Sequence, residues 1–204
     1  GVTPSADVVF ELGENTLTSF RMNTVDASQY EMIYTDADGV VHTEMGTSST
    51  VYHLSTYPNS TILFNNPKLS NIRVGYDTGT FNVNVTKVIL NSYDNVTKVF
   101  TRHNKVITEI VNFEKTPMVK IDANNSQNSI NLELKEIPKG VASIAADAFY
   151  GCTKITDIKV LNTTQMVTSG ANMFNAGTTI RVPNALLSQY QADANWSAYN
   201  LIGY

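Results

Sequence analysis

Four side chains in this sequence could support nucleophilic or metal chemistry: the thiol of Cys152 and the imidazoles of His42, His53 and His103. A thiol becomes a nucleophile when a neighbouring base takes its proton. One cysteine can form neither an internal disulfide nor a cysteine-based zinc site, and the spacing of the three histidines fits no metal motif. We therefore expect structural roles for all four residues, and we predict no catalytic, metal-binding or cofactor-binding residue.

Two carboxylates and three asparagines match further patterns. Asp36 and Asp38 precede Gly39, but an EF-hand loop supplies its calcium ligands over about 12 residues and ends in Glu. A plain turn is therefore the favoured interpretation. The N-glycosylation pattern begins at Asn84, Asn95 and Asn162. These matches mainly report turns that are rich in Asn and Thr.

Tyrosines are concentrated in the first half of the chain: Tyr30, Tyr34, Tyr52, Tyr57, Tyr76 and Tyr93. Tyrosine is favoured on recognition surfaces, where its ring and hydroxyl both make contacts. It is equally favoured in ordinary strands. Both a binding platform and plain strand packing remain open.

The composition excludes two classes of partner. The chain has 204 residues, of which 42% are hydrophobic and 16% charged, and its net charge is -4. Nucleic-acid binding requires clustered cations that neutralise phosphates, and there is no basic run. No apolar stretch approaches the roughly 18 residues that span a bilayer. The start at residues 1–5 lacks Met, which suggests a mature or trimmed start from which any signal peptide has been removed.

Short β-type runs recur through the second half of the chain with a nearly constant period. One series ends in Leu90, Phe113, Ile137, Val160 and Val182, and an interleaved series contains Val99, Ile121, Ile144 and Val167. Successive members lie 22 to 24 residues apart. Two series with one period predict a coil with an extended segment on each side. Spacing alone leaves a β-sandwich or an irregular antiparallel sheet as alternatives.

The residues of one repeat favour the coil. Residues 137–160 contain, in order, Ile-Pro, a turn with Gly, Ser-Ile, Ala-Phe, Gly-Cys and an apolar strand. This order resembles one unit of the BspA-type leucine-rich-repeat family. Residues 171–183 resemble a degenerate unit, and residues 184–199 resemble the C-terminal end of the family. Between residue 67 and residue 137 only the period matches.

Such a coil would bury a defined set of side chains. The residues expected to point inward are Ile144, Phe149, Ile155, Ile158 and Val160, with Cys152 as a small buried neighbour. Asn184 is expected to cap a helix over about 185–193. The residues expected to cover the open end are Leu186, Leu187, Tyr190, Trp196 and Tyr199.

The first 66 residues predict a small sandwich. The runs 31–35 and 40–44 flank the turn residues 36–39, which predicts a hairpin. The runs 51–54 and 61–64 predict further strands. The order resembles a PKD-like, immunoglobulin-like module, although the Gly-Asp-Gly turn and a preceding Trp of that family are missing. A sandwich of this size buries little core, so we expect it to lean on the following coil.

The sequence therefore predicts a mainly β protein, with a PKD-like β-sandwich module over residues 1–66 and a leucine-rich-repeat solenoid with a C-terminal capping helix over residues 67–204. The resemblance implies a bacterial cell-surface or secreted protein that binds an extracellular protein or glycan through the solenoid surface, without a cofactor and without enzymatic activity. Two alternatives stay open: a carbohydrate-binding module of a surface glycan-handling system, and a structural spacer or phage-tail-like component.

Overall fold

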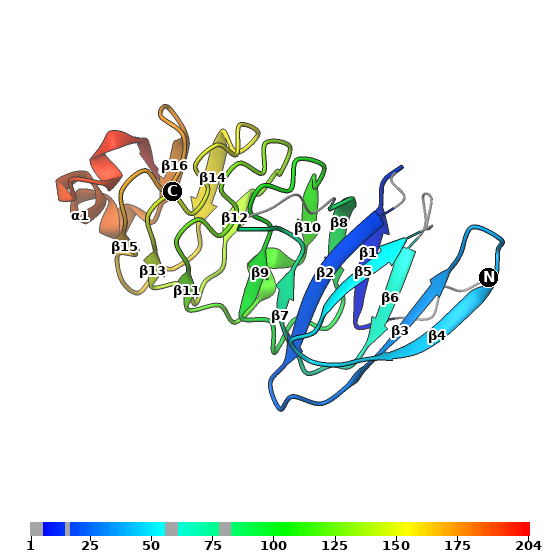
Figure 1. Cartoon of the computed structure of the whole chain (residues 1–204). Coiled ribbons are helices and arrows are strands. Elements are labelled where there is room, and N and C mark those ends of the chain that lie inside the picture. Colours follow the sequence, from blue (N-terminus) through cyan, green and yellow to red (C-terminus); the bar gives the residue numbers. More distant parts are fainter. Residues whose placement is uncertain (1–5, 15–16, 56–60, 78–82) are drawn as a thin grey trace.

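The computed structural model describes residues 6–14, 17–55, 61–77 and 83–204, and they form a mainly β protein (Figure 1). Two broad sheets lie at one end of the molecule. Short parallel strands follow, and the helix α1 (Leu187–Ala192) lies at the other end. One connected core of buried apolar side chains runs through both parts.

The two broad sheets pack face to face. The first has the order β10-β8-β1-β6-β3-β4, with β1 (Val8–Leu12), β3 (Tyr30–Thr35), β4 (Val41–Gly46), β6 (Thr61–Asn65), β8 (Val85–Leu90) and β10 (Glu109–Val111). The second has the order β5-β2-β7-β9, with β2 (Leu17–Thr24), β5 (Val51–Ser55), β7 (Leu69–Arg73) and β9 (Lys98–Phe100). Alternate residues point between the sheets. The ring of Phe20 therefore lies 5.6 Å from that of Phe10 and 5.3 Å from that of Phe64.

The predicted hairpin is confirmed. Strands β3 and β4 pair antiparallel, with Tyr34 opposite His42. One carboxylate oxygen of Asp36 accepts the backbone N–H groups of Asp38 and Val40, which closes the turn. The predicted runs 51–54 and 61–64 form β5 and β6.

Two ladders of parallel strands continue from the broad sheets. The first ladder contains β12 (Glu136–Ile137), β14 (Asp157–Val160), β16 (Thr179–Val182) and β17 (Asn200–Gly203). The second contains β11 (Lys120–Ile121), β13 (Ser143–Ile144) and β15 (Thr168–Ser169). In the first ladder Ile137 pairs with Val160, as the repeat spacing predicts, and in the second Ile121 pairs with Ile144. The five residues expected to point inward are all buried.

Phe113 and Val167 lie outside the paired positions of the predicted series, and Val99 pairs with Ile72 of β7 rather than with Ile121. Phe113 begins a 3-10 turn, η1 (Phe113–Lys115), after Asn112 adopts a φ of 66° and turns the chain away from β10. Ile144 pairs with Ser169 rather than with Val167. Val167 is still buried. Its backbone N–H donates to the Tyr190 hydroxyl instead of to a neighbouring strand. Apolar spacing therefore located the buried residues but not the register.

The boundary expected between residues 66 and 67 falls inside both broad sheets. Strand β8 pairs with β1, and β7 pairs with β2. Parallel pairing then extends each sheet, from β8 to β10 and from β7 to β9. The two parts of the chain thus share strands as well as a core.

Left-handed residues turn the chain at corresponding points, shortly after β11, β13 and β15. Asn124, Asp147 and Asn172 have φ values of 57°, 56° and 52°. The backbone N–H of Asn124 donates to the carbonyl of Ala146, and that of Asp147 to the carbonyl of Ala171, in each case in the following coil. Asn and Asp tolerate this conformation better than other residues with a Cβ.

Buried asparagines hold other turns. The side-chain amide of Asn104 donates to the carbonyls of Val74 and Val85, and its oxygen accepts two backbone N–H groups of its own turn. Asn162 plays the same role, donating to the carbonyl of Val141. Buried polar groups need such partners, and here one side chain ties two segments together.

The C-terminal end is covered by short helical turns and by β17. The expected helix over 185–193 is a 3-10 turn, η2 (Asn184–Leu186), followed by α1, and a further turn, η3 (Trp196–Ala198), comes after them. The expectation that Asn184 caps the helix is wrong: its side chain makes no cap bond, and its backbone N–H donates to the carbonyl of Tyr204 as β17 returns.

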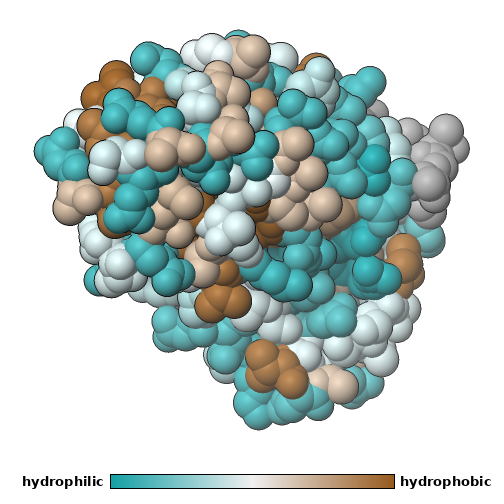
Figure 2. All heavy atoms as spheres, turned by 90° about the vertical axis from the view of Figure 1, so that its left-hand side faces the viewer, coloured by the Kyte–Doolittle hydropathy of each residue, from teal (hydrophilic) through white to brown (hydrophobic). Residues whose placement is uncertain are grey.

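Trp196 anchors this end. Its indole N–H donates to the carbonyl of Val167 at 2.8 Å, and its ring meets Tyr190 edge-on. Seen from this end, polar residues predominate on the surface and apolar residues form only small groups (Figure 2). The cap thus covers the apolar end of the parallel ladders, which would otherwise be exposed.

Candidate functional site

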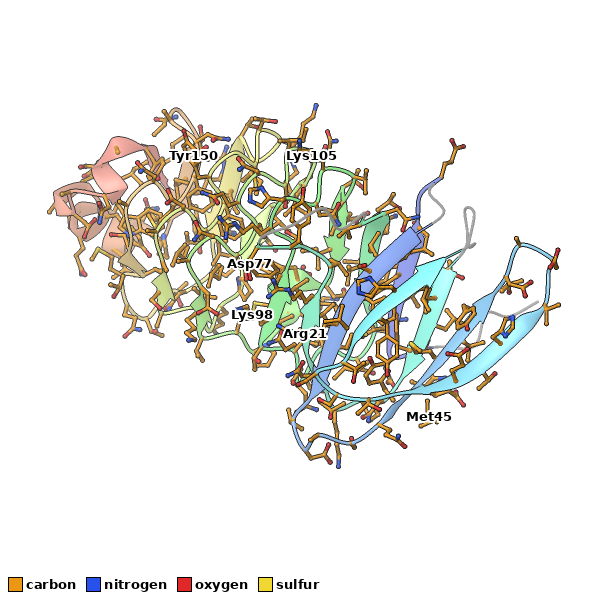
Figure 3. All side chains as sticks on the ribbon, in the orientation of Figure 1. Arg21, Met45, Asp77, Lys98, Lys105 and Tyr150 are labelled. Atoms are coloured by element: carbon orange, nitrogen blue, oxygen red, sulfur yellow. The ribbon has the colours of Figure 1, made fainter. Side chains whose placement is uncertain are left out.

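An open hollow of about 410 Å³ lies on the outer face of the β5-β2-β7-β9 sheet. We call it the arginine hollow, and it is lined by Ser19, Phe20, Arg21, Val51, Arg73, Gly75, Tyr76 and Asp77. Figure 3 shows Arg21 and Asp77 on this face, with Lys98 of β9 beside them.

The hollow forms where β7 leaves β2. Among the described residues, β2 pairs with β7 only from Arg21 to Thr24. Beyond Arg73 the chain bonds the segment after β9 instead, through Val74 to the carbonyl of Phe100 and Tyr76 to that of Arg102. Gly75 permits this approach, because a Cβ at that position would lie 2.4 Å from the carbonyl carbon of Thr101. The separation of the two strands leaves the hollow between them.

Positive charge exceeds negative charge in the hollow. Arg21 and Arg73 are directly opposite each other on neighbouring strands. Arg73 Nη2 lies 2.6 Å from Asp77 Oδ2, and Arg102 Nη1 lies 3.4 Å from Asp77 Oδ1. No ion pair of Arg21 is found among the described residues, and the segments outside them contain no Asp or Glu. Two of the four arginines in the chain thus share one carboxylate, and a third, Arg21, lines the same hollow.

The carboxylate is held in its charged form. Hydrogen bonding from Arg73, with a further contribution from Arg102, lowers the pKa of Asp77 below its ordinary value. Arg73 is fixed from its other side as well, because its guanidinium carbon lies 4.3 Å from the centre of the Phe100 ring. Arg73 is therefore held in place by its neighbours, while Arg21 has no ion-pair partner among the described residues.

The positive surface continues beyond the hollow along β9. Lys98 Nζ lies 2.6 Å from Asp122 Oδ2, and Lys120 Nζ lies 3.2 Å from Asp122 Oδ1. Two lysines again share one carboxylate. The pKa of Asp122 is lowered, first by the hydrogen bond from Lys98.

Uncharged polar groups lie in and beside the hollow: Ser19 and Tyr76 line it, and His53 is the cross-strand neighbour of Ser19. Ser19 Oγ and His53 Nδ1 lie 2.6 Å apart on the paired strands β2 and β5. A hydroxyl bonded to an imidazole is also the arrangement of an activated serine nucleophile. Here Ser19 is buried and the two residues are direct cross-strand neighbours, so the bond serves as a cross-strand pair. The Tyr76 ring lies 5.4 Å from that of His103 at the edge of the hollow.

Sequence reasoning did not predict this site. Arg21 and Arg73 are far apart in the chain, and so are Ser19 and His53. Only the pairing of β2 with β5 and β7 brings them together. The tyrosine concentration gave a partial signal, because Tyr76 lines the hollow.

The other tyrosines are placed differently. Tyr30 and Tyr34 are buried between or beside strands. Tyr52 stacks on Phe20 at 5.5 Å, and Tyr93 lies 5.9 Å from the ammonium nitrogen of Lys115. Tyr57 lies outside the described residues.

The residues first considered for chemistry have separate structural surroundings. Burial raises the pKa of the Cys152 thiol to about 12, and its Sγ donates to the carbonyl of Ser126. His42 Nε2 lies 2.7 Å from Asp36 Oδ2. His103 contacts Tyr76 and the amide of Asn128. Within the described ranges, no group of three or more His, Cys, Asp or Glu side chains could hold a metal ion.

All three asparagines of the glycosylation matches donate side-chain hydrogen bonds within the protein. The amides of Asn84 and Asn162 are buried and donate to the carbonyls of Gly13 and Val141. The amide of Asn95 donates to the carbonyl of Pro67. These bonds agree with turn-holding roles.

A second hollow of about 340 Å³ lies where β10 and β12 separate after a single bridge between Glu109 and Glu133. Its lining includes Glu114 and Glu136 as well, with Lys135 as a cation. The two hollows thus have opposite charge.

Comparison with protein-family models, with curated proteins and with solved structures finds no match for this chain. None of the helices among the described residues is long and apolar enough to cross a membrane.

Proposed function

We propose that this chain is a bacterial cell-surface or secreted binding protein, without enzymatic activity, that holds an extracellular partner on the face containing the arginine hollow. The observation that carries this proposal is the surplus of positive charge in an open hollow of a protein whose net charge is -4. Charge that is concentrated against the overall charge of a protein favours specific encounter with an oppositely charged partner.

The proposal includes the architecture. Residues 67–204 would be a BspA-type leucine-rich-repeat solenoid, and residues 1–66 a PKD-like module at its N-terminal end. The two parallel ladders, the buried repeat residues and the C-terminal cap support the solenoid. The two face-to-face sheets support a sandwich-like module, which also takes strands β7 to β10 from the region after residue 66. Solenoids present extended surfaces to their partners.

A second candidate is a carbohydrate-binding module. The observation that favours it is the mixed lining of the hollow, which offers the Ser19 hydroxyl and the Tyr76 phenol beside the apolar Val51. Pockets for small molecules combine apolar walls with a few directed polar groups. The binding partner would then be a glycan rather than a protein.

A binding screen tests the proposal. The full chain is applied to immobilised extracellular-matrix proteins and to a glycan array, beside two variants with the same change of charge. Arg21→Gln alters the hollow, and Lys154→Gln alters an exposed cation of the repeat region. A partner that is lost with Arg21→Gln and kept with Lys154→Gln supports the proposal. No partner on either array contradicts it and favours the structural-spacer alternative.

A further inference from the structure

We infer that the arginine hollow is a site for an acidic sugar residue, of which the Arg21 side chain binds the carboxylate. This inference rests on the proposed binding function and deepens it, because it names the chemistry of the ligand.

The first step is that Arg21 has no carboxylate partner among the described residues. Like charges opposite each other on neighbouring strands are unfavourable, and Arg21 and Arg73 are such a pair. Asp77 bonds Arg73 and Arg102 and leaves Arg21 without a carboxylate among the described residues. An anion beside Arg21 would offset the repulsion that the pairing creates.

The second step is that a carboxylate suits this position. The guanidinium group presents a planar fork of donors that binds both oxygens of a carboxylate at once. Arg73 already makes one short charge-assisted bond, to a single carboxylate oxygen of Asp77 at 2.6 Å, in the same hollow. A ligand carboxylate at Arg21 would repeat the interaction one strand away.

The third step is that the rest of the lining suits a sugar ring. Ser19 and Tyr76 provide hydroxyl and phenol groups that can bond sugar hydroxyls, and Val51 provides an apolar wall. The volume of about 410 Å³ lies within the range of small-molecule pockets, about 300–1,000 Å³. One or two sugar residues would fill it.

An extended peptide fits less well. Peptides that bind sheets add a strand to an open edge. The floor of the hollow is β2, which is an inner strand of its sheet and pairs with β5 along Leu17–Arg21. Only the short stretch of β2 before Arg21 faces the hollow without β7 beside it, which is little edge for a peptide strand. The polar side chains of the lining favour a ligand with many hydroxyl groups.

The test is a titration of the full chain with glucuronate, with glucose as the uncharged counterpart and with acetate as the carboxylate alone. We expect glucuronate to bind at least about tenfold more tightly than either, because only glucuronate combines the charge-assisted bond with the sugar contacts. Its affinity should fall as NaCl is added. Arg21→Gln should weaken glucuronate binding at least about tenfold, and Lys154→Gln should leave it unchanged.

Three results would overturn the inference. Equal affinity for glucose and glucuronate would show that the carboxylate does not contribute to binding. Equal affinity for acetate and glucuronate would show that the hollow binds anions without recognising the sugar. Unchanged glucuronate affinity of a folded Arg21→Gln variant would show that the ligand binds at another place on the protein. The comparison of the three ligands on the unmodified chain decides the matter even if the variant does not fold.

The outcome can be separated from that of the proposed function. An array partner that is lost with Arg21→Gln, together with no glucuronate binding, keeps the proposed function and overturns the acidic sugar. Selective glucuronate binding with silent arrays keeps the site and overturns the macromolecular partner.

Discussion

Arg21 has no ion pair among the described residues, and at the residue scale this makes its charge a cost to the fold. Its cross-strand neighbour is Arg73, and such like-charge neighbours destabilise a sheet by up to about 1 kcal/mol. Residues that a protein keeps at the expense of stability are commonly functional. The same residue therefore links the binding proposal to a measurable stability.

The first prediction compares two arginines. Arg21→Gln should leave the free energy of unfolding unchanged or raise it by a few tenths of a kcal/mol. Arg181→Gln should lower it, because Arg181 donates two hydrogen bonds to Asp157, at 2.8 and 2.7 Å. Urea unfolding at low salt measures both. A loss of stability in Arg21→Gln as large as that in Arg181→Gln would mean that Arg21 has a structural role.

At the scale of the element, the coil turns depend on residues that tolerate a positive φ. Gly151 and Gly177 have φ values of 82° and 83°. An added Cβ at Gly177 would meet nothing within 4 Å, whereas at Gly151 it would lie 2.2 Å from Asn128 Oδ1 and 3.1 Å from Asn128 Cα. The two glycines therefore share a backbone conformation and differ in packing.

The second prediction follows from this difference. Gly177→Ala should cost about 1 kcal/mol of stability, because an alanine in the left-handed conformation is strained. Gly151→Ala should cost about 1–3 kcal/mol more, because Asn128 in the preceding coil must move. Thermal unfolding of both variants provides the comparison. Equal losses would show that adjacent coils are not packed closely at this turn.

The third prediction concerns the C-terminal cap and pH. Asp193 Oδ1 accepts the backbone N–H groups of Trp196 and Asn195 and the hydroxyl of Ser169. These bonds lower the pKa of Asp193, with the Trp196 N–H as the largest cause. A carboxylate whose pKa is lower in the folded state stabilises that state above its unfolded pKa, about 3.9 for Asp. The stabilisation is lost as the pH falls through the folded pKa.

Asp193→Asn should therefore lower stability by about 0.5–1 kcal/mol at pH 7. The difference from the unmodified chain should shrink as the pH falls below about 4. The other carboxylates are common to both proteins, so the difference in stability isolates Asp193. Chemical unfolding at pH 7 and at pH 3 measures it. A difference that is the same at both pH values would contradict the cap interaction.

The elements also show how far the sequence could lead. The repeat period predicted the parallel pairs Ile137–Val160 and Ile121–Ile144, because each coil must bury an apolar side chain at the same point. It did not predict that β15 pairs two residues beyond Val167, because register depends on backbone contacts between coils. The arginine hollow could not be predicted from the sequence for a similar reason. It depends on which strands lie beside β2 and on where β7 leaves it.

At the scale of the whole molecule, the two parts of the chain share their sheets. Strands β7 and β8, which follow residue 66, pair with β2 and β1, which precede it. The fourth prediction is that the full chain unfolds in one transition and that a fragment of residues 67–204 does not fold cooperatively, because it loses the partners of β7 and β8. Circular dichroism during denaturation tests both. A fragment with a sigmoidal transition of its own would show that the repeat region is an independent domain.

The binding face is also a property of the whole molecule, because it combines strands from both parts of the chain. The most direct test uses the arginine side chains as reporters. Glucuronate is titrated into the full chain, and NMR spectra that resolve the arginine Nε–H signals are recorded. The four arginines are Arg21, Arg73, Arg102 and Arg181. We predict that the Arg21 signal shifts most and the Arg73 signal less. The Arg181 signal should not shift, because Arg181 is paired with Asp157 on β14 and β16, away from the hollow. Equal shifts of all four signals, or no shift of Arg21, would contradict a ligand site in the arginine hollow.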